Sequence, residues 1–115
     1  MKNINGLPLT QTNITLDELL ETYNPTGFYD PTGDTFTFGR DAELYAFVEN
    51  QHSALVVFTC LRGDFVLFTG TEYQCKVAFA QASRQFYSRG VSLSRIVSYF
   101  RAVGGLNKIL PQDGG

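Results

Sequence analysis

Residues 54–69 constrain the fold most, because they form two apolar runs that a sheet has to bury on both of its faces. The runs, 54–61 and 65–69, are rich in Val, Leu and Phe, and Arg62-Gly63-Asp64 separates them, which predicts a β-hairpin. Successive side chains of a strand point to opposite faces, yet in the first run both faces are apolar. Such a strand needs cover on each side. We therefore expect either helices on both faces of this sheet or an interface on one of them.

The N-terminal third of the chain combines a short helix with another hairpin. Residues 15–18 have the Thr and Glu spacing of a capping box, which predicts a helix over 16–23. The sequence Asp-Pro-Thr-Gly at 30–33 favours a type I turn. It lies between aromatic segments at 28–30 and 35–38, and these segments are the expected strands of the first hairpin.

Two more helices are expected in the middle of the chain. Residues 40–51 carry acidic side chains at their start and apolar ones at helical spacing, which predicts a helix. Thr71 is expected to cap a helix over 72–88, with Gly90 in the position just past its end.

A last helix begins after Ser92 and stops at Gly104-Gly105, and with it the elements predict an α+β fold. We expect a single small domain over residues 1–115, with a mainly antiparallel sheet built from two β-hairpins and a C-terminal helical pair packed on it. Apolar residues make up 43% of the chain and charged residues 17%, which is typical of a folded domain. Residues 1–12 and 106–115 are expected to be extended or frayed.

The chain carries little of the chemistry that catalysis or metal binding requires. His52 is its one histidine, and Cys60 and Cys75 have the spacing of neither a zinc site nor a redox pair. We expect both cysteines to be buried free thiols, with a Cys75-His52 dyad as the catalytic alternative. The sequence thus predicts no enzyme activity, no cofactor and no metal. Because no apolar segment is long enough for a signal peptide or a membrane span, we expect a soluble cytoplasmic protein that does not bind membranes.

Charge is unevenly distributed along the chain. Residues 1–70 hold three basic and nine acidic side chains, a net charge of −6, whereas residues 71–115 hold six basic and two acidic ones, a net charge of +4. Such asymmetry indicates contact with nucleic acid or docking on a surface of complementary charge. Each half therefore provides one candidate binding surface.

The acidic half predicts an aromatic surface that binds another protein. Tyrosine and phenylalanine anchor protein interfaces, and surrounding carboxylates suit a basic partner, including one that handles nucleic acid. The candidate residues are Tyr29, Asp30, Asp34, Phe36, Phe38, Asp41 and Glu43. Our leading hypothesis is a small non-enzymatic binding protein, a regulator or inhibitor of the kind that phages and plasmids encode, with a homodimer as a further option. The alternative is that these aromatic residues only cover the sheet.

The basic half predicts a nucleic-acid-binding surface as the alternative function. Gly90, Val91 and Ile96 resemble the turn and second helix of the helix-turn-helix family of DNA-binding domains, although Phe86 stands where that family has a small residue. The resemblance implies that side chains of the last helix, and of the segment that leads into it, contact phosphates. The candidate residues are Arg84, Arg89, Ser94, Arg95, Ser98 and Arg101. The other reading is a helical hairpin whose arginines are only solvated.

Overall fold

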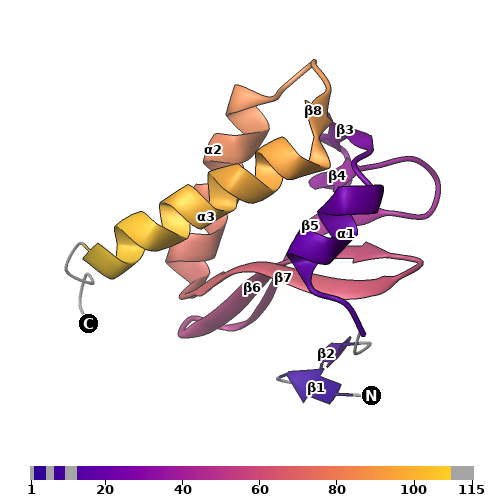
Figure 1. The fold of residues 1–115 in the computed structure, drawn as a ribbon. Coiled ribbons are helices and arrows are strands. Elements are labelled where there is room, and N and C mark those ends of the chain that lie inside the picture. The colour runs from indigo at the N-terminus through magenta and orange to yellow at the C-terminus, as the bar shows by residue number, and fades with distance from the viewer. Residues whose placement is uncertain (1, 5–6, 10–12, 110–115) are drawn as a thin grey trace.

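A curled antiparallel sheet with helices packed on one face forms the body of the structure (Figure 1). The computed structural model describes residues 2–4, 7–9 and 13–109, and this part of the chain holds three helices, a six-stranded sheet and a separate two-stranded hairpin. The helices are α1 (Leu16–Thr22), α2 (Glu72–Gln85) and α3 (Leu93–Ile109). The strands are β1 (Lys2–Ile4), β2 (Leu7–Leu9), β3 (Thr26–Asp30), β4 (Thr35–Thr37), β5 (Glu43–Asn50), β6 (Ser53–Cys60), β7 (Gly63–Gly70) and β8 (Val91–Ser92). The predicted α+β class is confirmed.

The expected caps form at the start of α1 and α2. The Glu18 N–H donates to Thr15 Oγ1 at 3.1 Å, and the Thr15 N–H donates to Glu18 Oε1 at 2.8 Å. Thr71 and Gln74 make the same reciprocal pair of bonds at 3.1 and 3.0 Å. Each pair satisfies two backbone N–H groups that an isolated helix end would leave without a partner. The predicted starts of both helices are therefore confirmed.

Residues 43–50 form the strand β5, so the helix predicted over 40–51 is wrong. The apolar positions fit both structures, because Leu44 and Val48 are four residues apart on a helix and also lie on one face of a strand. The neighbouring strand decides between them. β6 lies inside the sheet, and its backbone N–H and C=O groups need a partner strand on each side. β7 provides one partner and β5 the other.

The sheet has the strand order β7-β6-β5-β4-β3-β8, so β3 to β7 form a meander and β8 closes one edge. β8 connects α2 to α3 and pairs with β3 through Gly27 and Val91. Gly90 was predicted to be the left-handed residue after α2, but Ser88 takes that conformation instead, with a φ of 63°. A Cβ on Gly90 would lie 2.7 Å from Thr26 Cγ2. The absence of a side chain at Gly90 thus lets the chain approach β3 without displacing Thr26.

α3 continues through Gly104-Gly105 to Ile109, beyond its predicted end. Each glycine inside a helix costs about 1 kcal/mol relative to alanine. A Cβ on Gly104 would lie 3.9 Å from Phe68 of β7, so this part of the helix packs on the sheet. That packing offsets the low helix propensity. The ends predicted to be extended or frayed lie partly outside the described residues, namely at 1, 5–6, 10–12 and 110–115.

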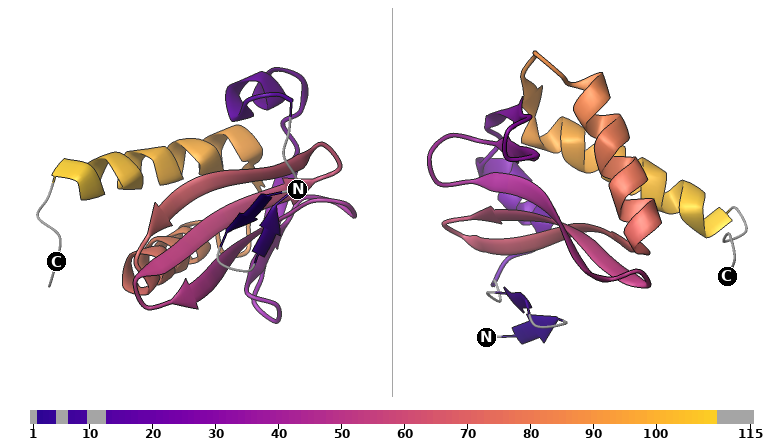
Figure 2. Two further views of the ribbon diagram at one scale, coloured as in Figure 1. Left: turned by 90° about the horizontal axis from the view of Figure 1, so that it is seen from below. Right: turned by 180° about the vertical axis from the view of Figure 1, so that it is seen from behind.

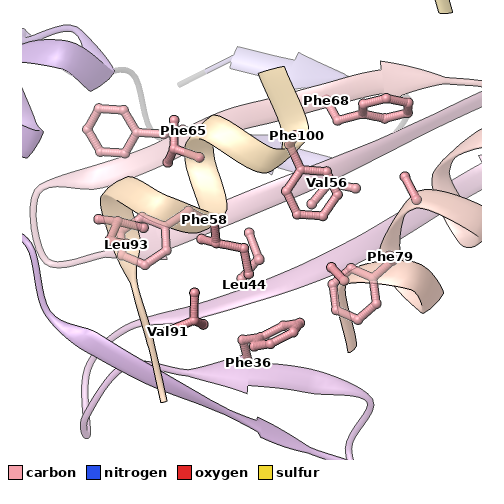
Figure 3. Packing of buried hydrophobic residues seen from close by; sticks show 14 of the residues in the cluster. Phe36, Leu44, Val56, Phe58, Phe65, Phe68, Phe79, Val91, Leu93 and Phe100 are labelled. Atoms are coloured by element: carbon pink, nitrogen blue, oxygen red, sulfur yellow. The ribbon is translucent and has the colours of Figure 1, made fainter. Parts of the chain in front are cut away.

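The hydrophobic core fills the space between the helices and the sheet (Figure 3). Phe58 of β6 lies in it and contacts Phe38 edge to face, with 5.3 Å between ring centroids. Phe36 of β4 contacts Phe79 of α2 in the same manner at 5.6 Å. Burial of a side chain of this size contributes about 1.5–3 kcal/mol, and aromatic pairs add to that. These contacts hold the helices on one face of the sheet.

The N-terminal hairpin is separate from this core. β1 and β2 pair antiparallel, with Asn3 opposite Pro8. Figures 1 and 2 both show the hairpin on the side of the sheet opposite to α2 and α3. Helices and hairpin therefore lie on different sides of the six-stranded sheet.

The substitution Gly27→Ala tests the contact between β3 and the core. The new Cβ would lie 2.4 Å from the ring of Phe38, which is only 3% exposed and packs on Phe58. Because the new methyl group would displace the Phe38 ring from its contact with Phe58, we expect the free energy of unfolding to fall by about 1–3 kcal/mol in urea denaturation. Gly33→Ala is the control, since its Cβ would meet no atom closer than 3.4 Å, and it should change stability by less than about 0.5 kcal/mol. Equal stability of the two variants would contradict the close contact.

Candidate functional site

The surface of the sheet opposite the helices, which we call the far face, is the main candidate site. Directly opposed residues of antiparallel strands point to the same side, so the strand register defines this surface row by row. Three rows run across β5, β6 and β7: Glu43, Thr59 and Asp64; Tyr45, Val57 and Val66; Phe47, Leu55 and Thr69. Thr37 and Phe28 continue the first row over β4 and β3. The far face thus has an apolar centre beside a row that carries two carboxylates, Glu43 and Asp64.

The apolar centre of the far face is only partly covered. Leu55 and Val57 are 6% and 0% exposed, and Tyr45 packs against both. Val66 and Phe28 expose 38% and 55% of their surface. In the described part of the chain all three helices pack against the opposite face. Of the two arrangements expected from the sequence, helices on both faces of the sheet therefore do not form. The N-terminal hairpin lies on the same side as the far face (Figure 2).

The far face is acidic as well as apolar. Strands β3 to β7 contain four carboxylates and neither lysine nor arginine. The pKa of Tyr45 is raised, first by burial and then by the charges of Asp64 and Glu43, so both carboxylates act on this one side chain. Its phenol, which is protonated at neutral pH like that of any tyrosine, can donate a hydrogen bond. Asp64 also accepts a hydrogen bond from the Thr59 hydroxyl, which orients its carboxylate.

The seven residues predicted to form one aromatic and acidic surface lie in different places. Phe36 and Phe38 are 0% and 3% exposed and belong to the core, so they do not reach the surface. The other five lie in three separate parts: Tyr29, Asp30 and Asp34 in the β3–β4 hairpin, Asp41 in the β4–β5 connection, and Glu43 on the far face. Phe36 is buried because it stands opposite Tyr29 and Leu44 on the side of the sheet that faces the helices.

A hydrogen bond orders the tip of the β3–β4 hairpin. The Tyr29 hydroxyl donates to Asp34 Oδ1 at 2.6 Å, and this bond is the first cause of the raised pKa of Tyr29. Asp34 has a φ of 53°, a conformation that Asp tolerates better than most residues. Asp30 accepts a hydrogen bond from the N–H of Thr32 at 3.0 Å. These carboxylates therefore stabilise the turn, and the ring of Tyr29 contacts Tyr87, which is 54% exposed.

The arginines near the α2–α3 connection do not form a single row. Arg89 and Arg95 both lie over the ring of Phe86, with guanidinium carbons 5.7 and 5.5 Å from its centroid. Such cation–π contacts hold the side chains in place. Arg101, further along α3, forms an ion pair with Asp17 of α1 at 2.9 Å. The structure thus brings two of the predicted arginines together and turns a third towards α1.

The connection between α2 and α3 differs from that of a helix-turn-helix. That motif joins its helices by a turn of about three or four residues, whereas 86–92 separate α2 from α3 and include β8, which belongs to the sheet. Ser94, a predicted phosphate contact, donates its backbone N–H to Asn24 Oδ1 at 2.8 Å. Arg84 and Ser98 are exposed on α2 and α3. The helical pair is therefore tied to the sheet.

Cys75 has the properties of a core residue. It is fully buried, and burial raises the pKa of its thiol to about 11, whereas a nucleophilic cysteine has a lowered pKa. His52 is exposed in the β5–β6 turn, with Nε2 3.2 Å from Gln51 Nε2. Cys60, also expected to be buried, is half-buried. Within the described residues, no group of three His, Cys, Asp or Glu side chains is placed to hold a metal ion.

Of the eleven side chains in these rows of the far face, only Glu43 was among the predicted site residues. Tyr45 and Phe47 lie in the segment assigned to a helix, and Val66 lies in the second apolar run. The sequence signal was weak, because residues 44–48 are all apolar, and the alternation appears only in the structure, where Leu44, Ala46 and Val48 pack towards the helices. Reading this segment as a strand would have placed Tyr45 and Phe47 on one face together.

Comparison with protein families, curated proteins and solved structures finds no match for this chain. A search of the described segments for a helix long and apolar enough to cross a membrane finds none. The function therefore has to be inferred from the residues of this chain.

Unfolding at alkaline pH tests the burial of Cys75. Its thiol has a pKa of about 11 in the folded protein against 9.0 without burial, so the unfolded chain loses this proton first as pH rises. The stability that the protonated thiol contributes is present below about pH 9 and is lost between about pH 9 and 11. We expect the free energy of unfolding to fall over this range by about 2 kcal/mol more in the wild type than in Cys75→Ala, as measured in urea. The same pH dependence in both would show that the thiol is not buried.

Proposed function

We propose that this chain is a small non-enzymatic protein that docks a basic partner protein on the far face of its sheet. The observation that carries the proposal is the exposure of Val66 and Phe28 on a surface that also bears Glu43 and Asp64 and has no basic residue in its strands. Protein interfaces combine an apolar centre with a polar rim in this way. The apolar centre gains free energy by burial, and the carboxylates select for positive charge.

Tyr45 is the residue best suited to anchor a partner on this surface. Its ring rests on Leu55 and Val57, so it loses little conformational freedom when a partner binds. Its hydroxyl can donate a hydrogen bond to a partner carbonyl. The predicted helical pair supports this role from the opposite face, because the core under β5 to β7 keeps the strands in a fixed arrangement.

The charge of the far face narrows the class of partner. Lysine and arginine side chains around an apolar patch would complement Glu43 and Asp64, as on a protein that handles nucleic acid. Phosphates of a nucleic acid would be repelled by the same carboxylates. A second copy of this chain would place like charges opposite each other if the two far faces met. A regulator or inhibitor of phage or plasmid type would act by covering the basic surface of its target.

Nucleic-acid binding by the basic helices is the second candidate function. Arg89 and Arg95 support it, because Phe86 holds both guanidinium groups at one place on the surface. Arg84 adds an exposed charge nearby on α2. The ion pair between Arg101 and Asp17 makes that arginine less available for phosphates. The far face is favoured over these arginines because its carboxylates and exposed apolar side chains lie on one sheet surface that the strand register defines.

Affinity capture from cells that naturally make the protein tests docking, with Glu43→Lys/Val66→Ser as the disabled variant. Glu21→Lys/Ala102→Ser is the matched control, because it makes the same change in net charge at exposed positions of α1 and α3. Captured proteins are identified by mass spectrometry, and the affinity of the purified partner is measured by biolayer interferometry. We expect a basic protein whose affinity falls at least about tenfold in the far-face variant and less than about twofold in the control. Added salt should weaken the binding as it screens the charges.

Three results would contradict docking on the far face. An acidic partner would contradict the charge complementarity, and equal affinity for both variants would exclude this surface. Loss of binding after nuclease digestion of the lysate would show that nucleic acid links the two proteins, which favours the arginines of the helical pair.

A further inference from the structure

An open pocket of about 360 Å³ lies outside the far face, where three segments distant in the sequence meet. The end of α1 contributes Tyr23, the β4–β5 connection contributes Arg40 and Asp41, and the β6–β7 turn contributes Arg62. This volume is near the lower end of the range for small-molecule sites. Neither docking on the far face nor the basic helices make use of this pocket.

The aromatic wall of the pocket is held in place by the core. Phe38 contacts Phe58 edge to face at 5.3 Å between centroids, and Tyr23 contacts the same ring at 6.4 Å. Gly39, with a φ of 85°, makes the turn that brings Arg40 to the rim. Because these groups are fixed by packing and by the turn, the pocket exists before any ligand enters, which lowers the cost of binding.

Two arginines without an ion pair define the charge of the pocket. Arg40 and Arg62 are exposed, and neither forms a hydrogen bond or ion pair with another residue in the described part of the chain. A guanidinium group presents parallel N–H donors that match a carboxylate or a phosphate. Two such groups at one pocket repel each other, and an anion between them would relieve that repulsion. The Tyr23 hydroxyl adds a hydrogen-bond donor. The pKa of this hydroxyl is raised, first by burial and then by Cys60 and Asp41.

We propose that this pocket binds a small aromatic anion, with its carboxylate or phosphate on Arg40 and Arg62 and its ring against Tyr23. The apolar wall suits the ring of such a ligand, and the cationic rim suits its carboxylate or phosphate. Asp41 in the wall suits a hydroxyl or amine substituent and disfavours a ligand with several negative charges. The proposal does not depend on the docking function, because the two surfaces consist of different residues.

An NMR titration of the ¹⁵N-labelled full chain tests this site with phenyl phosphate and phenylacetate as probes. Phenylacetamide, which has the ring without the charge, and inorganic phosphate, which has the charge without the ring, are the controls. We expect both aromatic anions to shift the backbone amide signals of the pocket segments with a Kd of about 1 mM, as suits ligands of this size. Each control compound should bind at least about tenfold more weakly.

Paired variants locate the binding groups. Arg40→Gln/Arg62→Gln should raise the Kd for phenyl phosphate at least about tenfold, whereas Arg84→Gln/Arg89→Gln, with the same loss of charge on another surface, should leave it within about twofold. The spectra of both variants also report whether they remain folded. Three results would overturn the proposal: no shifts in the pocket segments up to about 20 mM of either aromatic anion, equal binding of phenylacetamide, or equal effects of the two double variants.

Discussion

The burial of β6 on both of its faces is the constraint on which the rest of the structure depends. Its backbone requires a strand on each side, which makes residues 43–50 extended although their spacing also suits a helix. On one face, Val56 and Phe58 are covered by the helical layer. On the other face, Val57 is fully buried beside Tyr45. A strand of this kind needs the helices as cover on one face. On the other face, the neighbouring strands leave the apolar side chains Val66 and Phe28 exposed.

Close backbone contacts fix the helical layer to the sheet. Gly27 allows β3 to pass directly over the ring of Phe38, and Gly90 allows the chain after α2 to approach β3. β8 then adds the connection between α2 and α3 to the sheet as its edge strand. The helices are therefore attached to the sheet at its β8 edge, and Phe100 of α3 contacts Phe68 of β7 at the other edge. The same attachment makes the connection between α2 and α3 part of the sheet, unlike the short turn of a helix-turn-helix.

The sequence predicts the local features of this fold well. Thr15 and Thr71 cap the helices that they were expected to cap, because capping depends on residues within one turn. The segment 40–51 was misassigned because its apolar residues satisfy two periods, and only pairing with β6 decides between them. Phe36 and Phe38 were expected at a surface, yet composition does not tell which face of a strand is buried. The far face and the pocket arise from register and from the meeting of distant segments, for which no local pattern exists.

The most direct test of this account is the solvent exposure of valine methyl groups along the far face, measured as NMR line broadening by a soluble gadolinium chelate. The structure has Val66 38% exposed and Val56 and Val57 both 0% exposed. We expect strong broadening of the Val66 methyl signals and little of the other two. If Val57 broadened as much as Val66, β6 would not be buried on both faces. If Val66 were as protected as Val57, the far face would be closed within the molecule, and docking of a partner on it would be excluded.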